Sequence, residues 1–381
     1  MKILILGGDG FCGWPTALRF AAKGHTVKIV DNLSRRKIDL ELSSNSLIPI
    51  ASINERVKCA QKLVGDITFE MADVATQPQE LRSILGSFQP DTIVHFAEQR
   101  AAPYSMIADR ERRYSVDNNV SGTHNLCSAI VDLCPNAHLI HLGTMGVYGY
   151  TEAFGEIPEG YLNIKINQTG KDADILYPAN PGSVYHMTKC LDQLIFQFYN
   201  KNWALKVTDL HQGIVWGAAT PETSLHHDLA NRFDYDGIYG TVLNRFIIQA
   251  ASGNDLSVYG TGGQSRAFIN ISDTAECVYL AALNDDFTPE KVRIFNQVAE
   301  VQTVSALAEM VANLFNAKVG YFENPRKELA ENKLFVTNRG LKSLGFNPIK
   351  LSEKLVEEVK VLADQNSMNL NKHNLNNSPK W

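Results

Sequence analysis

Residues 2–23, KILILGGDGFCGWPTALRFAAK, decide the fold of this chain of 381 residues. An unbroken apolar run leads into a glycine turn, and the residues after the turn carry apolar side chains at helical spacing. Gly7, Gly10 and Gly13 give the turn the spacing GxxGxxG. Glycine is needed there because the turn is tight, the backbone approaches a phosphate and the helix packs closely on the strand. The stretch therefore predicts a strand, a phosphate-binding turn and a helix whose first amides face a pyrophosphate.

The alternation of strands and helices continues after this unit. Further apolar runs typical of buried strands occur at residues 26–30, 92–97, 138–142 and 207–210. Long helices are expected over 183–203 and 303–316. Strands that alternate with helices form a parallel sheet with right-handed crossovers. The sequence therefore predicts an α/β fold, a Rossmann-type doubly wound parallel sheet with a smaller C-terminal lobe.

The chain is expected to contain three parts. Residues 1–215 form the dinucleotide-binding domain, 216–365 form a substrate-binding lobe that is partly interleaved with it, and 366–381 form a polar, flexible tail. Residues 33–72 insert about forty residues into the first part and are expected to form a short helix and an ordered excursion. A loop of this length in a compact domain is either a functional lid or disordered. We favour a lid over the substrate.

Composition and charge narrow the range of functions. With 44% hydrophobic and 20% charged residues the chain is globular, and its net charge of −5 is spread without a basic stripe, so nucleic acid is not an expected partner. No apolar run approaches the ~20 residues that cross a bilayer. The cysteines are scattered, without metal-type spacing, at Cys12, Cys59, Cys127, Cys134, Cys190 and Cys277. We expect a soluble cytoplasmic protein with reduced thiols and no metal site.

An acid at the end of the second strand indicates the cofactor. Asp31 is placed to accept hydrogen bonds from both ribose hydroxyls of an adenosine and to repel a 2′-phosphate, which favours NAD over NADP. Arg35 and Arg36 could instead bind such a phosphate. Asp73, followed by Val74, is placed to meet the adenine edge, although it could merely cap the helix that follows.

The segment YHMTK carries the predicted chemistry. Its Tyr185 and Lys189 are four residues apart and therefore share one helical face. A tyrosine with a pKa near ~10 is a poor base at neutral pH, and a lysine beside it lowers that pKa. Thr144, at the end of the strand HLIHLG, would bond the same substrate hydroxyl as Tyr185, or it could only cap the strand. The three residues predict oxidation of a sugar hydroxyl.

These motifs, with Asn118 in NNVSGT and the late segment YGTGGQSRAFINISDTA, resemble the extended short-chain dehydrogenase/reductase superfamily, which includes UDP-galactose epimerases and sugar dehydratases. Further segments, such as SLIPIASINERV, HFAEQRAAPYSMI, LGTMGVYG and RFDYDGIYGTVLNRF, are similar to the family of UDP-sulfoquinovose synthases, over about residues 3 to 330. The resemblance implies an enzyme that uses NAD, UDP-glucose and sulfite. The implied steps are oxidation at C4, loss of water across C5 and C6, sulfite addition at C6 and re-reduction at C4.

The resemblance also implies the residues of the site. For the cofactor they are Gly7, Gly10, Phe11, Cys12, Gly13, Asp31, Asn32, Ser34, Arg35, Asp73, Val74, Phe96, Arg100, Asn118, Tyr185, Lys189 and Val215. For the substrate they are Arg100, Thr144, Tyr185, Gln212, Val242, Leu243, Asn244, Arg245, Ser257, Val258, Tyr259, Arg266 and Arg326. Arg266 and Arg326 would pair with the diphosphate, and Arg100 could attract sulfite. Each arginine could instead form a surface salt bridge.

The acid or base for the loss of water is unassigned. Related dehydratases carry an Asp–Glu pair after the threonine, whereas Met145 and Gly146 stand here and neither can carry a proton. His186, beside Tyr185, and Glu98, at the end of a strand, are the candidates for catalytic proton transfer. His186 could instead pack against Tyr185 or orient it.

The resemblance implies a homodimer built from helices near 105–131 and 183–203. A separate protein could deliver the sulfite. Two rival classes remain open: a UDP-hexose 4-epimerase or related nucleotide-sugar dehydratase, and a non-catalytic NAD-sensing protein. The complete set of Thr144, Tyr185 and Lys189 weighs against the second, because a binding protein has no use for an activated phenol.

Overall fold

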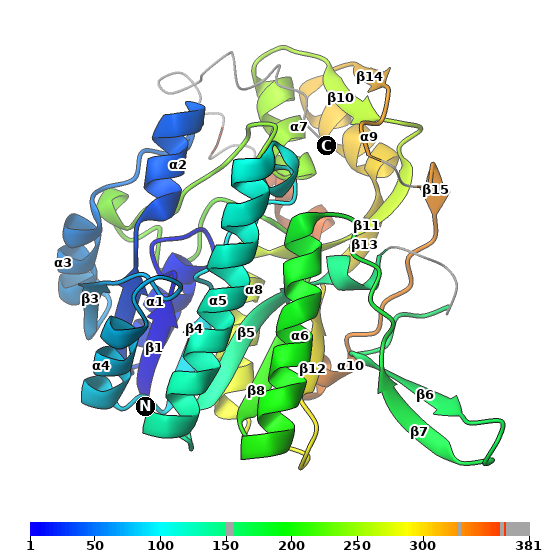
Figure 1. Cartoon of the computed structure of the whole chain (residues 1–381). Coiled ribbons are helices and arrows are strands. Elements are labelled where there is room, and N and C mark those ends of the chain that lie inside the picture. Colours follow the sequence, from blue (N-terminus) through cyan, green and yellow to red (C-terminus); the bar gives the residue numbers. More distant parts are fainter. Residues whose placement is uncertain (150–154, 327–328, 359–361, 363–381) are drawn as a thin grey trace.

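The chain folds around a parallel sheet, and the computed structural model describes residues 1–149, 155–326, 329–358 and 362 (Figure 1). Seven strands lie in the order β12-β8-β5-β4-β1-β2-β3, and every neighbouring pair runs parallel. They are β1 (Lys2–Leu6), β2 (Thr26–Asp31), β3 (Ile67–Met71), β4 (Thr92–His95), β5 (His138–Thr144), β8 (Lys206–Gln212) and β12 (Arg293–Gln297). The predicted Rossmann-type doubly wound sheet is confirmed.

Helices cover both faces of this sheet. On the face toward the viewer in Figure 1 lie α4 (Pro78–Phe88), α5 (Asp109–Leu133) and α6 (Val184–Trp203), and on the other face α1 (Gly13–Ala22) packs against α8 (Ile271–Leu283). Leu4 and Leu6 of β1 are buried under the first group, whereas Ile3 and Ile5 are buried under the second. A strand covered on both faces buries every side chain, which is why this run is continuously apolar.

The glycine turn has the predicted form. Gly7 has a φ of +79°, and a Cβ there would lie 2.6 Å from the carbonyl carbon of Phe96. A Cβ on Gly13, where α1 begins, would lie 2.2 Å from the carbonyl oxygen of Gly7. Any side chain at either position would therefore push the strand, the turn and the helix apart.

Residues 33–72 are more closely integrated than the predicted insertion. They contain α2 (Ser34–Leu42), α3 (Ile53–Leu63) and β3, which pairs with β2 as the edge strand of the sheet. Between the two helices, Leu47 and Ile48 are buried in the core of the lobe. The expectation of one short helix and an excursion was therefore wrong, because the segment completes the sheet and also reaches the lobe.

The smaller lobe lies beyond the carboxyl ends of the strands. Its elements are β9 (Ile214–Trp216), α7 (Val242–Ala251), β10 (Leu256–Tyr259), β11 (Gly263–Asn270), β13 (Glu300–Thr303), α9 (Val304–Phe315), β14 (Val319–Phe322) and β15 (Glu331–Asn332). Its core packs α7 and α9 against β10 and β11. Elements after residue 216 nevertheless return to the main sheet, since α8 packs on α1 and β12 pairs with β8. The two parts are interleaved in sequence.

The remaining elements are short, apart from one hairpin. They are η1 (Tyr104–Met106), η2 (Met145–Tyr148), η3 (His227–Leu229) and α10 (Arg339–Ser343). The hairpin of β6 (Tyr161–Lys165) and β7 (Asp172–Leu176) projects away from the body at the lower right of Figure 1. None of the helices in the described ranges combines the length and apolarity required to cross a membrane. The predicted tail, 366–381, lies outside the described residues.

Candidate active site

One continuous cavity runs from the glycine turn to the lobe. It passes over the carboxyl ends of β1, β4 and β5 and reaches α7, β10 and the residues around Asn324. The chain leaves β1 toward β2 on one side, and β4 lies on the other side of β1. Ligands of doubly wound sheets bind at such a point, where the strand order reverses.

Asp31 lies at one end of this cavity, at the last position of β2. Its two carboxylate oxygens accept hydrogen bonds from the backbone N–H groups of Asp9, at 2.9 Å, and Leu33, at 2.7 Å. Burial and the neighbouring Asp9 carboxylate raise the pKa of Asp31 to about 6. The group lines the cavity where a ribose would lie after the glycine turn.

The arginines near Asp31 are occupied by protein carboxylates. Arg36 donates two hydrogen bonds to Asp9, at 2.6 and 2.8 Å, and the fully buried Arg56 donates a third at 2.7 Å. Burial opposes ionisation of Asp9, but the two arginines outweigh it and lower its pKa. Arg35 is ion-paired with Asp39 and with Asp234, the latter at 3.2 Å. Both positive charges that could have bound a 2′-phosphate are therefore neutralised within the protein.

Asp73 adopts the local role that the sequence left open. One carboxylate oxygen accepts hydrogen bonds from the backbone N–H groups of Ala75 and Thr76, and the other accepts one from the side chain of Asn32. Val74 lines the cavity whereas Asp73 does not. Asp73 thus shapes the turn that presents Val74, and its predicted contact with adenine has no support in this geometry.

Thr144, Tyr185 and Lys189 meet where β5 ends. Tyr185 and Lys189 lie one turn apart on α6, with the Lys189 ammonium 6.0 Å from the centroid of the Tyr185 ring. The Thr144 hydroxyl oxygen accepts a hydrogen bond from the backbone N–H of Gly146 at 3.1 Å, and the Thr144 side chain acts to lower the pKa of Tyr185. Thr144 therefore caps the turn after β5, its predicted contact with the substrate hydroxyl stays a prediction, and all three residues line the cavity.

Glu98 changes the electrostatics expected for this group. Its buried carboxylate is ion-paired with the Lys189 ammonium, which also donates to the carbonyl oxygen of Leu142 at 2.7 Å. Burial raises the pKa of Tyr185 to about 12, although Lys189 acts to lower it. Lys189 does act to lower the pKa of Tyr185, as expected, but burial raises that pKa by more. The Glu98 carboxylate also offsets part of the Lys189 charge.

His186 lies against the backbone that replaces the dehydratase pair. A Cβ built on Gly146 would lie 2.3 Å from Cδ2 of His186 and 2.4 Å from its Nε2. The Nδ1 atom is 3.1 Å from the hydroxyl oxygen of Ser183, the N-cap of α6. Burial, together with Arg326 and Arg266, lowers the pKa of His186 to about 3. The imidazole is therefore neutral, and it lines the cavity.

Most of the predicted substrate residues line the lobe side of the cavity. They are Arg100, Gln212, Val242, Arg245, Ser257, Tyr259, Arg266 and Arg326. Leu243 and Val258 do not line the cavity, because both side chains are completely buried in the core of the lobe. Asn244 does not line it either, since it is buried and donates to the carbonyl oxygen of Asp234 at 3.2 Å. In β10 the side chains alternate, so Ser257 and Tyr259 face the cavity and Val258 faces the core.

The predicted cofactor residues follow the same pattern at the other end. Those that line the cavity are Gly7, Gly10, Phe11, Cys12, Gly13, Asn32, Ser34, Phe96, Asn118 and Val215. Tyr239 was missed, although it is buried beside them with the Arg35 guanidinium 3.5 Å from its ring centroid. The two glycines that flank it in the segment GIYG mark a turn, and this pattern could have identified Tyr239 as a candidate site residue.

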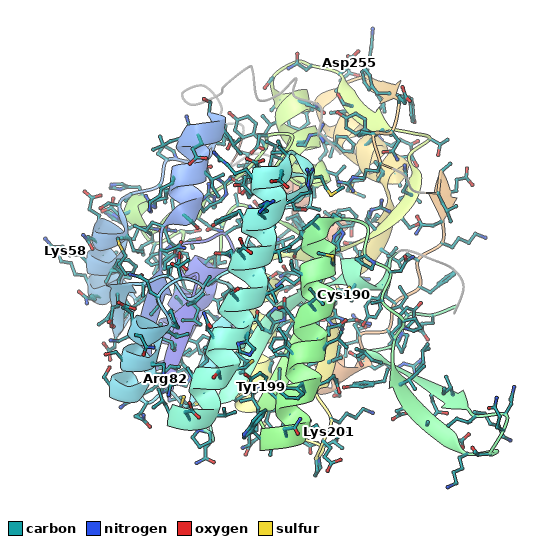
Figure 2. The ribbon with its side chains drawn as sticks, viewed as in Figure 1. Lys58, Arg82, Cys190, Tyr199, Lys201 and Asp255 are labelled. Atoms are coloured by element: carbon teal, nitrogen blue, oxygen red, sulfur yellow. The ribbon has the colours of Figure 1, made fainter. Side chains whose placement is uncertain are left out.

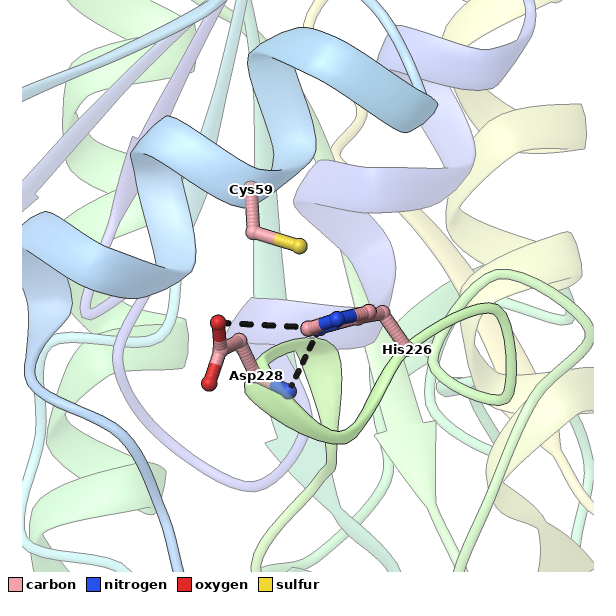
Figure 3. Close-up of side chains that lie close together, drawn as sticks. All are labelled: Cys59, His226 and Asp228. Atoms are coloured by element: carbon pink, nitrogen blue, oxygen red, sulfur yellow. Dashed lines mark hydrogen bonds and ion pairs between the residues drawn. The ribbon is translucent and has the colours of Figure 1, made fainter.

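Three potential metal ligands gather away from the cavity: Cys59 of α3, His226 at the N-cap of η3 and Asp228 within η3 (Figure 3). Their ligand atoms lie within 4.8 Å of one another. The Nδ1 atom of His226 accepts a hydrogen bond from the backbone N–H of Asp228 at 3.2 Å, which caps η3. Burial raises the pKa of the Cys59 thiol. None of the three lines the cavity, so the cluster takes no part in its chemistry.

Comparison of the sequence with known families agrees with this geometry. A family model described as the NAD dependent epimerase/dehydratase family matches residues 3–296. A spinach (Spinacia oleracea) protein named "UDP-sulfoquinovose synthase, chloroplastic" is 43% identical over 368 residues, which are 94% of this chain and 74% of the relative. A Sulfolobus acidocaldarius protein named "UDP-sulfoquinovose synthase" is 42% identical over 369 residues, 95% of this chain and 91% of the relative.

Solved structures show the same fold at lower identity. A UDP-glucose 4-epimerase from Thermotoga maritima, solved with UDP-glucose, has a TM-score of 0.72 at 21% identity and covers 96% of this chain and 99% of its own. A dTDP-glucose 4,6-dehydratase from Bacillus anthracis, solved with NAD, has a TM-score of 0.70 at 18% identity. The match covers 96% of this chain and 97% of the dehydratase. At these identities the likeness concerns the fold alone.

Proposed function

The chain belongs to the NAD-dependent epimerase/dehydratase family, and we propose that within this family it is a UDP-sulfoquinovose synthase. The reaction converts UDP-glucose and sulfite into UDP-sulfoquinovose and one molecule of water. The observation that carries the proposal is the meeting of Thr144, Tyr185, Lys189 and His186 in one cavity, in a chain that is 42–43% identical to two proteins with that name.

The cofactor is NAD, and the residues at the glycine turn fit it. The turn has no room for side chains at Gly7 or Gly13, so its backbone amides can approach a pyrophosphate. Asp31 offers carboxylate oxygens where the ribose hydroxyls would lie, while Arg35 and Arg36 are already ion-paired. When bound, NAD accepts a hydride from C4 of the sugar and later returns it, so the reaction involves no net oxidation.

Tyr185 and Thr144 act on the C4 hydroxyl. The Thr144 hydroxyl orients the phenol, and the two groups together can bind one substrate oxygen. Burial holds the pKa of Tyr185 high in the free protein, but bound NAD would add a positive charge to the cavity and lower it. The Tyr185 phenolate would then accept the hydroxyl proton as C4 is oxidised, and the phenol would return it when C4 is reduced. A C4 ketone makes the C5 proton acidic, which is why oxidation precedes the loss of water.

We assign the proton transfer at C5 and C6 to His186 rather than to Glu98. Glu98 is buried in an ion pair with Lys189, and although burial opposes its ionisation, Lys189 and His141 lower its pKa, so it holds no proton to donate. His186 is a neutral imidazole in the cavity and can accept a proton. Its ring also takes the space that a side chain at position 146 would need.

The diphosphate of UDP-glucose would prepare His186 for this role. Arg326 and Arg266, which lower the pKa of His186, are the residues proposed to bind the diphosphate oxygens. Burial is the larger cause of the low pKa of His186, but two phosphate charges would offset the two guanidinium charges and remove their part of the shift. Substrate binding would therefore make His186 a stronger base than it is in the free protein. Arg100 lines the same cavity and is ion-paired with Asp234, a carboxylate that Arg35 and Arg232 also contact. Because Asp234 has these two other cations, the Arg100 guanidinium is proposed to turn to the sulfite anion.

A homodimer built on α5 and α6 is also proposed. The two helices pack side by side on the face seen in Figure 2, where Cys190 and Tyr199 are labelled on α6. Along α6, Met187, Leu194 and Phe198 are exposed by 38%, 58% and 55%. Their spacing of seven and four residues forms one apolar stripe, which a second copy of the helix pair would cover.

The test is incubation of the NAD-loaded protein with UDP-glucose and sulfite, followed by mass spectrometry of the nucleotide sugar. A sulfonated product supports the proposal. Formation of UDP-galactose alone would make the chain a 4-epimerase, and recovery of unchanged UDP-glucose in every condition would leave only NAD binding. Adding a sulfite-releasing protein in place of free sulfite tests whether the sulfur donor is itself a protein.

A further inference from the structure

A buried array of charged side chains lies beneath Lys189. It contains Glu98 after β4, His141 of β5, Lys189 of α6 and Asp209 of β8, with His211 two residues further along β8. All five residues are at most 4% exposed at the side chain. Burial of so many charges is costly unless they are paired, so the pairing pattern has consequences for the reaction.

His141 is the central member, because each ring nitrogen contacts charged neighbours. Its Nδ1 lies 2.8 Å from a carboxylate oxygen of Asp209. Its Nε2 lies 3.1 Å from Glu98 Oε1 and 3.0 Å from the Lys189 Nζ. With protons on both nitrogens, the ring donates to Asp209 and Glu98. With a proton on Nδ1 alone, Nε2 can only accept, and its donor is then the Lys189 ammonium.

Four members of the array, Lys189, His141, Glu98 and Asp209, balance in charge when His141 is an imidazolium. Burial and the Lys189 ammonium oppose that charge, but Asp209 and Glu98 outweigh them and raise the pKa of His141 to about 9. Two cations, Lys189 and His141, then face two carboxylates, Glu98 and Asp209.

The other titratable groups that face His141 add no further charge. His95, whose ring centroid is 5.8 Å away, is neutral because burial lowers its pKa to about 3. Asp192 of α6, 3.7 Å away, keeps its proton because burial and then Glu98 raise its pKa well above the ordinary value. Loss of the His141 proton would therefore leave the array with an excess negative charge directly beneath Lys189.

The array ends inside the protein. Asp209 contacts His211 at 2.9 Å, His211 contacts the hydroxyl of Tyr148 at 2.6 Å, and that hydroxyl donates to Asn296 at 3.0 Å. Tyr148 is 1% exposed and Asn296 is completely buried. Along these contacts the array therefore does not carry protons to bulk water, and its effect on the site is electrostatic.

We propose that His141 is a positioning residue whose proton sets how much of the Lys189 charge reaches Tyr185. As an imidazolium it shares the carboxylate of Glu98, so that the Lys189 ammonium is less fully offset and stabilises the Tyr185 phenolate. When His141 is neutral, the Glu98 carboxylate pairs with Lys189 alone and offsets more of its positive charge. The Tyr185 phenolate is then less stable. The inference rests on the proposed role of Tyr185 as the base.

The test measures the ionisation of Tyr185 directly. The NAD-bound protein is labelled with ζ-¹³C tyrosine, the Tyr185 resonance is assigned with Tyr185→Phe, and its chemical shift is titrated with pH. The NAD-bound protein is used because the positive charge of the cofactor would lower the Tyr185 midpoint from its value in the free protein toward the pH range where His141 is charged. In His141→Gln that midpoint should rise by at least one pH unit, which is about a tenfold loss of phenolate at a given pH. His141→Lys, which keeps a cation, should restore the midpoint. His138→Gln is the matched control, since His138 is buried on the same strand but contacts Thr208 at 2.8 Å.

An unchanged midpoint in folded His141→Gln overturns the inference. If His141→Gln does not fold, His141→Lys is compared with the wild type above pH 9, where only the wild type loses the charge, and equal phenolate fractions would overturn it. The NMR titration of Tyr185 does not depend on whether the protein forms a sulfonated product. A shifted midpoint without sulfonated product therefore refutes the proposed function alone, and product without a shift refutes the inference alone.

Discussion

The imidazole of His186 and the backbone of Gly146 share one space. A single methyl group on Gly146 would lie 2.3 Å from the ring, closer than any real van der Waals contact. In Gly146→Ala we therefore expect the imidazole to move and the rate of product formation to fall by about 10- to 100-fold, since displacements near 1 Å have costs of this order. Gly86→Ala is the control, because a Cβ there meets nothing within 4 Å. A fully active Gly146→Ala enzyme would remove the positional argument for His186.

Replacement of His186 itself should separate two parts of the reaction. In His186→Asn we expect C4 oxidation, seen as reduced nicotinamide absorbance on mixing with UDP-glucose, to persist. Formation of sulfonated sugar should fall by about 10²- to 10⁴-fold, the usual loss when a general acid or base is removed. If both signals disappear together, the residue orients Tyr185 instead. Ser183→Ala, which removes only the contact to Nδ1, should give a smaller loss.

The affinity for NAD should depend on pH through Asp31. Its pKa is raised from an ordinary value near ~3.9 to about 6 in the folded protein. Below about pH 6 the carboxyl group holds a proton and cannot accept hydrogen bonds from both ribose hydroxyls. We therefore expect the dissociation constant of NAD to rise as the pH falls below about 6, by up to about tenfold per unit. Calorimetry of Asp31→Asn should show weaker binding that no longer varies in this window.

The diphosphate arginines should depend on the shape of the guanidinium as well as on its charge. Lysine keeps the positive charge but loses the planar fork that binds two oxygens. In Arg266→Lys we expect the KM for UDP-glucose to rise about tenfold, with a smaller change in kcat. Arg82→Lys is the matched control, since Arg82, which is labelled in Figure 2, pairs with Asp132 on the surface. Equal KM values in both variants would argue against diphosphate binding by Arg266.

The apolar stripe on α6 should control the oligomeric state. Leu194→Glu together with Phe198→Glu would bring two carboxylates into the proposed interface, where unpaired charge is strongly disfavoured. Light scattering should then report a monomer where the wild type is a dimer. Leu40→Glu is the control, because Leu40 is 79% exposed on α2, outside the proposed interface. A wild type that is itself monomeric would exclude this interface.

The local parts of the site could be predicted from the sequence. The glycine turn, Asp31 at the end of β2 and the pair Tyr185 and Lys189 each depend on a spacing within a few residues. Glycine spacing and helical periodicity report directly on such geometry. Thr144 could be predicted as a site residue because it stands at the end of an apolar strand. The sheet was predicted for the same reason, since its buried strands are short apolar runs.

Long-range partners could not be predicted in this way. Glu98 was singled out, but its ion pair with Lys189 joins residues far apart in the sequence and changes the balance of charge at Tyr185. Leu243 and Val258 were assigned to the substrate together with their neighbours, although only one face of a helix such as α7 and alternate positions of a strand such as β10 meet the cavity. Strand β12 was not recognised, because its polar residues Asn296 and Gln297 are buried through hydrogen bonds rather than apolar contacts.

Arg35 joins the first and middle thirds of the chain at the cavity. It is ion-paired with Asp234, and its guanidinium packs on the ring of Tyr239. Protein synthesis delivers the glycine turn long before it delivers Asp234 and Tyr239. A nascent chain with its first strands complete therefore has the phosphate-binding turn but not the wall that encloses its ligand. Stable retention of the dinucleotide should begin only after the ribosome has released the segment that follows β9.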